Sequence, residues 1–172
     1  MIGHDDVLRA ALKTGELDIV VGFVSQSDAE LESHSILEDD CVVVASKTHR
    51  IFRKRPRLKD LLDYRWVLGG KSVATRAWLE HAFTTRGLPP PHVQIETNLL
   101  LLLPTLIQEN QMLSFVSRRH LGRGSPLREI ELRETTMRRK FALSYRKLSY
   151  LSPASLRLAD LLRKRGRELF DA

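Results

Sequence analysis

The stretch of this sequence closest to a known chemical motif is Gly70-Lys71-Ser72. It resembles the end of a phosphate-binding P-loop, in which backbone amides and a lysine hold phosphate oxygens. That motif needs a glycine five residues before Gly70, and the chain has Arg65 there. A nucleotide site is therefore disfavoured.

Other catalytic and metal-binding patterns are incomplete. No serine lies in a G-x-S-x-G pattern, and the six histidines show no H-x-x-x-H or H-E-x-x-H spacing. Cys41 lies in an apolar stretch without a basic neighbour in sequence, which predicts a buried and inert thiol. We therefore expect a protein that is not an enzyme and that uses no metal or cofactor.

Length and composition are those of a folded protein. The 172 residues fit one compact domain or two small lobes, and 42% of them are hydrophobic and 28% charged. A single cysteine excludes a disulfide framework, and no run of 18 apolar residues predicts a membrane span. Residues 1–13 lack the apolar core of a secretory signal. The expected location is the cytoplasm.

Charge is distributed unevenly along the chain. The net charge is +7, but residues 1–45 carry −8 and residues 46–172 carry +15. Five basic residues gather in a short run that contains one aromatic residue, Phe52: Arg50, Arg53, Lys54, Arg55 and Arg57. With so little aromatic interleaving, a solvated loop is favoured over a nucleic-acid patch.

Hydrophobic patterning predicts strands alternating with helices, which is typical of an α/β fold. The apolar run Leu17–Phe23 reads as a buried parallel strand. Helices are expected at 6–14, 58–62, 73–86, 99–109 (interrupted by Pro104) and from Ser152-Pro153 to about 169. Further strands are expected at 31–37, 41–46, 65–68, 92–96, 112–116, 127–132 and 140–145.

Several stretches, in order along the chain, resemble the effector-binding domain of LysR-type transcriptional regulators. They are Leu12–Gly22 (LKTGELDIVVG), Ile36–His49 (ILEDDCVVVASKTH), Glu96-Thr97-Asn98 and Leu151–Ala154 (LSPA). Their order and spacing over almost the whole chain make the resemblance specific. The family usually has Gly-x-Gly where this chain has Asn110-Gln111-Met112, and Asn110 is expected to take the left-handed conformation that ends a helix.

The resemblance implies a type 2 periplasmic-binding-protein-like fold, with two α/β lobes joined by two crossover strands. Lobe I would be residues 1–40 plus 140–172, and lobe II residues 41–139. Family members begin with a winged helix-turn-helix and a strand–helix–strand, and the chain starts at what resembles the next helix. We therefore expect an incomplete first lobe, in a fragment or truncated product.

The resemblance and the usual place of ligands in α/β sheets together predict an effector site at the carboxyl ends of strands. The expected residues are Gly22, Phe23, Val24, Gly70, Lys71, Ser72, Thr97, Asn98, Val116 and Ser117. For Ser72 and Thr97, helix capping is an equal alternative, since a cap and a ligand use the same backbone donors.

The leading hypothesis is a non-enzymatic effector-sensing domain, which controls transcription through a DNA-binding domain outside this chain. Its expected partners are a small-molecule effector, a second copy in a homodimer or tetramer, and promoter DNA through the other domain. Effectors in the family are mostly small carboxylates, aromatic acids or metabolites, so we expect a carboxylate. A stand-alone solute-binding module of the same fold is the alternative. A protein that binds nucleic acid through its own basic segment comes third; salt-dependent binding would support it.

Overall fold

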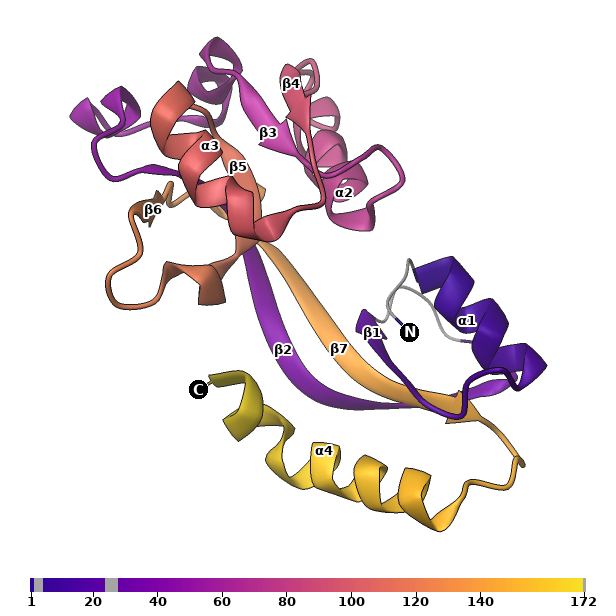
Figure 1. Cartoon of the computed structure of the whole chain (residues 1–172). Helices are drawn as coiled ribbons and strands as arrows, with labels where there is room; N and C mark the ends of the chain where they lie inside the picture. The colour runs from indigo at the N-terminus through magenta and orange to yellow at the C-terminus, as the bar shows by residue number, and fades with distance from the viewer. Residues whose placement is uncertain (2–4, 24–27, 172) are drawn as a thin grey trace. The chain divides into compact units, whose positions relative to one another are not determined.

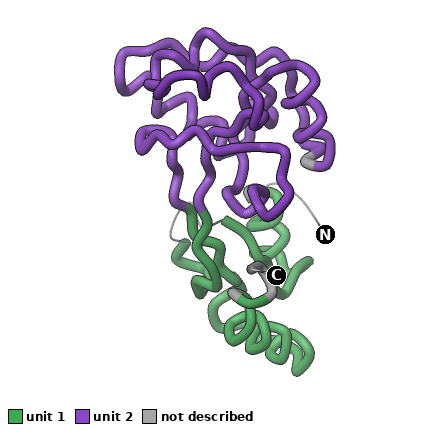
Figure 2. Tube along the Cα trace, turned by 90° about the vertical axis from the view of Figure 1, so that its left-hand side faces the viewer, with its two compact units in different colours: residues 1–39, 139–172 green, residues 40–138 purple. Residues whose placement is uncertain are grey.

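The computed structural model describes Met1, residues 5–23 and residues 28–171 (Figure 1). The chain divides into two compact units (Figure 2). Unit 1 comprises residues 1–39 and 139–172, and unit 2 comprises residues 40–138. Sequence reasoning placed the lobe boundaries after residues 40 and 139. The chain passes from unit 1 to unit 2 within one long strand and returns within another.

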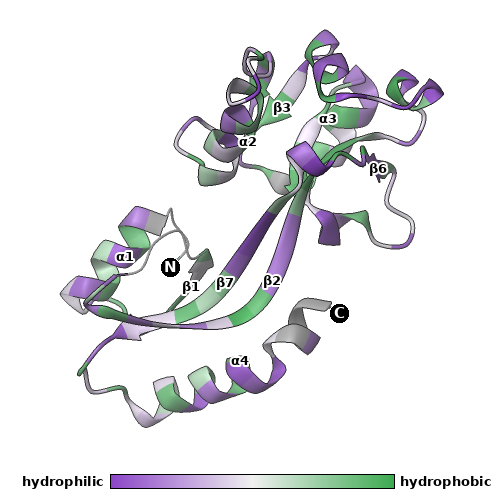
Figure 3. Cartoon of the chain, turned by 180° about the vertical axis from the view of Figure 1, so that it is seen from behind, coloured by the Kyte–Doolittle hydropathy of each residue, from purple (hydrophilic) through white to green (hydrophobic). Residues whose placement is uncertain are grey.

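The described residues of unit 1 form three strands and two helices. Its strands are β1 (Val20–Phe23) and its portions of β2 (Leu31–Ser46) and β7 (Met137–Arg146), in the order β1-β7-β2. Its helices are α1 (Asp5–Thr14) and α4 (Pro153–Asp171). Figure 3 shows β7 hydrophilic near the boundary between the units and more hydrophobic farther along.

Two strand predictions in this region were wrong. β1 runs antiparallel to β7, not parallel to a neighbour. It is the outermost strand in the order β1-β7-β2, so only one of its residues, Val20, is buried. The strands expected at 31–37 and 41–46 form the single strand β2. The acidic residues between them do not break it, because Asp39 and Asp40 form ion pairs with arginines.

Unit 2 holds a mixed sheet with helices on both faces. Its own strands are β3 (Trp66–Leu68), β4 (Val93–Glu96), β5 (Ser114–Ser117) and β6 (Leu127–Glu129). Its α-helices are α2 (Ala74–Thr84) and α3 (Leu103–Asn110). Short 3-10 helices occupy η1 (Arg50–Arg53), η2 (Leu58–Asp63), η3 (Leu100–Leu102), η4 (Arg118–Leu121) and η5 (Arg133–Thr135).

Alternation along the strands separates the two faces of this sheet. Val67 and Val116 join one hydrophobic cluster with residues of α3, such as Ile107. Their neighbours point to the other face, where Phe115 stacks on Trp78 of α2 with ring centroids 5.9 Å apart. Helices α3 and α2 therefore cover opposite faces, which keeps the strands buried and fixes where their carboxyl ends lie.

Helix ends follow local chemistry, with two departures from expectation. Gly15 has φ +85° after α1, as a helix-terminating glycine should. The left-handed residue after α3 is Gln111 (φ 49°), not Asn110, which is the last helical residue. Pro104 lies in the first turn of α3, where it does not interrupt the helix. Of the helices that the structure describes, none is long and apolar enough to cross a membrane.

Candidate functional site

Three loops meet at one edge of the sheet of unit 2. Strands β3 and β4 are parallel, with Leu68 opposite Glu96, and a parallel bridge joins Trp66 to Leu113 just before β5. The carboxyl ends of the three strands therefore lie at the same edge. A Cβ on Gly69 would lie 3.4 Å from Asn98 Oδ1, so the loops after β3 and β4 are in contact. In open α/β sheets this is the edge where ligands bind.

Most of the sequence-predicted residues come together at this edge. They are Gly70, Lys71, Ser72, Thr97, Asn98, Val116 and Ser117. Gly22 and Phe23 lie in β1 of unit 1, paired with Ala142 and Phe141 of β7. Val24 lies outside the described residues. The structure thus brings seven of the predicted residues to one edge of unit 2 and places two in unit 1.

The loop after β3 presents backbone and cationic groups to solvent. Lys71 and Ser72 are exposed, and a Cβ on Gly70 would meet no atom within 4 Å. Helix α2 has Val73 as its N-cap and no side-chain cap, so Ser72 does not cap it. The amides of Val73 and Arg76 donate to the Gly70 and Val73 carbonyls at 3.0 and 2.9 Å, which leaves those of Ala74 and Thr75 as the first-turn N–H groups that favour an anion.

Arg76 holds this loop in place. Its side chain is 5% exposed, and it donates hydrogen bonds to the Gly69 carbonyl (3.0 Å), Glu80 (2.8 Å) and Glu96 (2.6 Å). Burial alone would lower the pKa of this guanidinium, but the hydrogen bonds to the two glutamates outweigh it and raise the pKa. Arg76 therefore stays charged and joins α2, the loop after β3 and the end of β4.

The loop after β4 is ordered by Thr97. Its amide donates to the Leu68 carbonyl at 2.9 Å, which continues the pairing with β3. Its hydroxyl oxygen accepts the amide of Leu99 at 3.1 Å, which orders the turn before η3, and its role in ligand binding stays a prediction. The hydroxyl proton of Thr97 can still be donated elsewhere. Asn98, the next residue in the sequence, is exposed.

The end of β5 is packed more tightly than the two loops. Val116 is 6% exposed and packs in the hydrophobic cluster, so its side chain belongs to the core. Ser117 is 8% exposed, and its hydroxyl oxygen accepts the Arg119 amide at 3.2 Å. Arg118 then pairs with Glu129 (2.8 and 2.9 Å) and with Asp40. Of the three loops, those after β3 and β4 offer the more accessible polar groups.

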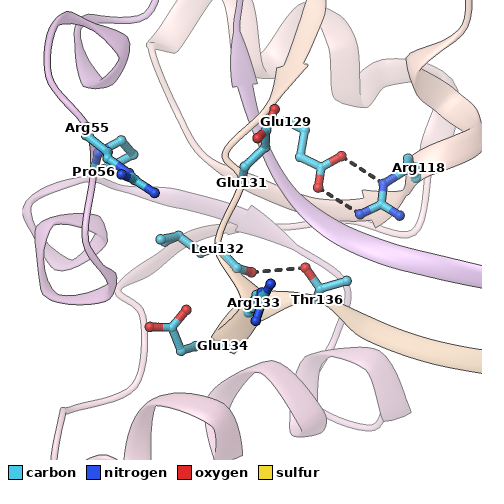
Figure 4. A pocket seen from close by; sticks show the side chains of 9 residues that line it. All are labelled: Arg55, Pro56, Arg118, Glu129, Glu131, Leu132, Arg133, Glu134 and Thr136. Atoms are coloured by element: carbon cyan, nitrogen blue, oxygen red, sulfur yellow. Dashed lines mark hydrogen bonds and ion pairs between the residues drawn. The ribbon is translucent and has the colours of Figure 1, made fainter.

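A separate polar hollow of about 750 Å³ lies elsewhere in unit 2 (Figure 4). One wall carries the Arg118–Glu129 pair, and Thr136 donates to the Leu132 carbonyl at 3.0 Å. Charged side chains of both signs line it, the cations Arg55 and Arg133 and the anions Glu131 and Glu134. It contains none of the sequence-predicted site residues.

A smaller hollow of about 350 Å³ is lined by Tyr64 and Gln111, among others. His49, which is 2% exposed, contacts both of these lining residues. Its Nδ1 accepts the Ile51 amide at 3.1 Å, and its Nε2 lies 3.0 Å from the Gln111 carbonyl. Burial lowers the pKa of this imidazole, so the neutral form fits the site. The described residues contain no group of three or more His, Cys, Asp or Glu that could hold a metal ion.

The family of the chain follows from a comparison with known protein families. Residues 2–167 match the LysR substrate binding domain. The chain belongs to this family. A LysR substrate-binding domain is the effector-binding part of a LysR-type transcriptional regulator, and its fold is of the type 2 periplasmic-binding-protein kind. The resemblance read from the sequence is thereby confirmed, together with the α/β fold and the effector-binding role.

A curated relative supports this placement. The HTH-type transcriptional regulator GalR of Pseudomonas putida is 26% identical over 164 residues. That match covers 92% of this LysR domain and 41% of the relative, so the chain spans less than half of the relative's length.

Solved structures of LysR effector domains share the fold. The effector-binding domain of QuiR in complex with shikimate matches with a TM-score of 0.77 and 18% identity, over 96% of this chain and 79% of that one. The regulatory domain of CcmR from Synechocystis PCC6803, in complex with 2-PG, has a TM-score of 0.79 and 19% identity, over 92% and 77%.

Sequence reasoning did not identify Arg76 or Arg118 as part of this region. The spacing of Arg76 and Glu80, four residues apart in a predicted helix, is a usable signal for their ion pair. The bond from Arg76 to Glu96 has no such signal, because it joins a helix to a strand 20 residues away.

Proposed function

We propose that this LysR domain binds a small anionic effector, a carboxylate, at the edge formed by the loops after β3 and β4. The observation that carries the proposal is the start of α2. It has no side-chain cap, and the open Gly70 and exposed Lys71 lie just before it. Backbone N–H groups and a nearby cation are the groups that hold a carboxylate.

The proposed roles follow from what each group can do. Lys71 supplies a positive charge, Ser72 and Thr97 supply hydroxyl donors, and Asn98 supplies an amide that can donate or accept. Ser117 and the backbone at Val116 border the same edge. Gly22, Phe23 and Val24 stay predictions of the family resemblance. Shikimate, the ligand of the QuiR domain, is itself a carboxylate, which agrees with the proposed class.

We also propose the setting in which the domain acts. Effector binding would alter how a cytoplasmic regulator, assembled as a homodimer or tetramer, acts on promoter DNA through a winged helix-turn-helix domain. The match to the transcriptional regulator GalR supports this setting. No catalytic step is proposed, since the family consists of regulators.

The test is a ligand screen with two matched glycine variants. A panel of small carboxylates and their uncharged amide analogues is screened by thermal shift, and hits are measured by calorimetry. We expect a carboxylate to stabilise the protein and its amide analogue not to. Gly70→Ala should weaken binding by about tenfold or more, because its methyl group would occupy space that the bound carboxylate needs.

Gly122→Ala is the control, because that glycine also has open space around it and a negative φ of −58°. It should leave the affinity unchanged. Equal losses in the two variants would contradict the proposed site. Binding of amides as tightly as carboxylates would contradict the proposed ligand class.

A further inference from the structure

The basic run that sequence reasoning assigned to a solvated loop belongs to a larger cationic surface of unit 2. We define this basic surface as Lys47, Arg50, Arg53, Lys54, Arg55, Arg57 and Arg128. The guanidinium of Arg128, on β6, lies 4.4 Å from the centre of the Phe52 ring. The Lys47 amide donates to the Pro126 carbonyl at 3.0 Å, so the end of β2 lies next to the start of β6. All seven side chains are exposed.

Few acidic groups balance this charge. Asp60 is hydrogen-bonded to the Arg57 amide at 2.9 Å and lies 3.5 Å from Arg57 Nε. Its pKa is lowered first by that amide and also by the charges of Arg57 and Lys54. Glu131 and Glu134 line the large hollow together with Arg55. Unit 2 as a whole has 17 basic and nine acidic side chains, a net charge of +8.

The aromatic rings beside the basic surface are already covered by arginine guanidinium groups. Arg128 lies over Phe52, and Arg50 lies over Tyr64 at 5.0 Å from the ring centre. Recognition of single-stranded nucleic acid uses exposed aromatic faces on which bases stack. Here the rings hold two arginines in place instead, so the surface offers fixed positive charge without stacking platforms. That chemistry fits a regular row of phosphates.

We propose that the basic surface contacts the phosphate backbone of duplex DNA without reading its sequence. Duplex DNA carries one negative charge per about 1.7 Å of its axis, so a group of exposed cations can neutralise several phosphates at once. The choice of DNA over an acidic protein rests on the proposed function, since a transcriptional regulator works beside DNA. The basic surface shares no residue with the proposed effector site.

The experiment measures binding of the chain to a labelled, mixed-sequence DNA duplex by fluorescence anisotropy, over a range of salt concentrations. The test variant is Arg53→Ala/Lys54→Ala/Arg55→Ala. The control is Lys147→Ala/Arg157→Ala/Arg165→Ala, which removes the same residue types from exposed positions of unit 1. Because the six side chains are exposed, both variants should keep the unfolding temperature of the original chain.

We expect the test variant to bind about tenfold or more weakly at low salt. The slope of log K against log salt should fall by about 2 to 3, since each lost phosphate contact removes about 0.9. The control should change both quantities much less. Equal losses in the two variants would overturn the proposal, because they would show a response to net charge alone. Absence of duplex binding at low salt would overturn it too.

A competition experiment identifies the class of molecule that binds the basic surface. Unlabelled duplex should displace the probe better than single-stranded DNA of equal length or poly-glutamate does. Stronger displacement by poly-glutamate would overturn the proposal in favour of an acidic protein partner, and stronger displacement by the single strand would overturn the duplex assignment. Both variants are also measured with any effector found, and the effector affinity should stay unchanged. Failure of the effector site and failure of the basic surface are therefore told apart.

Discussion

The two units are stabilised by different interactions. In unit 2, strand β3 lies between β4 and β5, and its three residues are 3% exposed or less. Helices α2 and α3 cover the two faces of this sheet. In the described part of unit 1, strand β1 has Val20 as its one buried residue. Apolar burial is therefore more extensive in unit 2, while in unit 1 smaller apolar clusters are supplemented by polar side chains that join distant segments.

These polar links in unit 1 are well defined. Arg146 of β7 donates to the Leu12 carbonyl at the end of α1, at 2.7 Å. Arg139 forms two hydrogen bonds, of 2.6 and 2.8 Å, with the buried Asp39. Tyr145 donates to Glu32 at 2.8 Å, and that bond is the largest of the influences that lower the pKa of the carboxyl group. Each bond joins segments more than 99 residues apart in sequence.

The largest expected effect tests the apolar side of this comparison. Leu113 of unit 2 and Leu12 of unit 1 are both fully buried. Truncation of a buried leucine costs about 2 to 5 kcal/mol, and the cost is greatest where neighbours cannot relax. Leu113→Ala should therefore lower the free energy of unfolding by about 4 kcal/mol. Leu12→Ala, in a small cluster with Val20 and Leu31, should lower it by about 2 to 3 kcal/mol.

Urea unfolding followed by circular dichroism measures both values, and hydrogen exchange assigns them to the units. The control is Val7→Ala, at a residue on α1 that is 46% exposed. It should change stability by less than about 0.5 kcal/mol. A larger loss for Leu12→Ala than for Leu113→Ala would reverse the comparison.

How much of the fold could be predicted from the sequence also differs between the two units. In unit 2 the short strands and both helices were found close to their observed places, because apolar periodicity and flanking turn residues carry that information. The identity of β1 was misread: a run of apolar residues looks the same in a central strand and in an outer one. Which neighbour a strand acquires depends on segments far away, here β7, more than 110 residues later in the chain.

The candidate site was predictable to the extent that it is local. The loops after β3 and β4 were located because a ligand edge follows from strand order and from residues such as Gly70 and Thr97. Arg76 was missed, because its importance comes from Glu96 and the Gly69 carbonyl, which only the folded sheet brings to it. The basic run was visible in sequence, but its extension by Arg128 across the Phe52 ring was not.

A smaller effect tests the polar side of the comparison. Arg146→Met keeps much of the side-chain volume but removes the charged hydrogen bond to the Leu12 carbonyl. Hydrogen bonds of charged groups contribute about 1.5 to 3 kcal/mol, and this loss should appear in urea unfolding. Arg157→Met, at an exposed position of α4, is the matched control and should cost less than about 0.5 kcal/mol. Equal losses of unfolding free energy in the two variants would show that the bond from Arg146 to the Leu12 carbonyl does not stabilise unit 1.

The smallest expected effect concerns a polar group inside the apolar unit. Burial lowers the pKa of His49 below its usual value of 6.5, so the folded protein holds the imidazole neutral. Below pH 6.5 the unfolded chain binds a proton that the folded chain does not. Stability from this residue is therefore present above pH 6.5 and is lost as the pH falls through that value toward the folded pKa. For one proton the loss is at most about 1.4 kcal/mol per pH unit.

Unfolding free energies of the original chain and of His49→Gln, measured from pH 7.5 down to about 5, isolate this contribution. Glutamine cannot take up a proton, so the stability of the variant should depend less steeply on pH even if its absolute stability is lower. Asp28 and Asp60 have pKa values lowered below 3.8 by their hydrogen bonds, so they titrate below this window. Identical slopes for both proteins would mean that His49 takes up a proton as readily in the folded protein as in the unfolded chain, even though protonation of Nδ1 ends its acceptance of the Ile51 amide. Unit 2 would then tolerate a buried charge that its apolar packing should exclude.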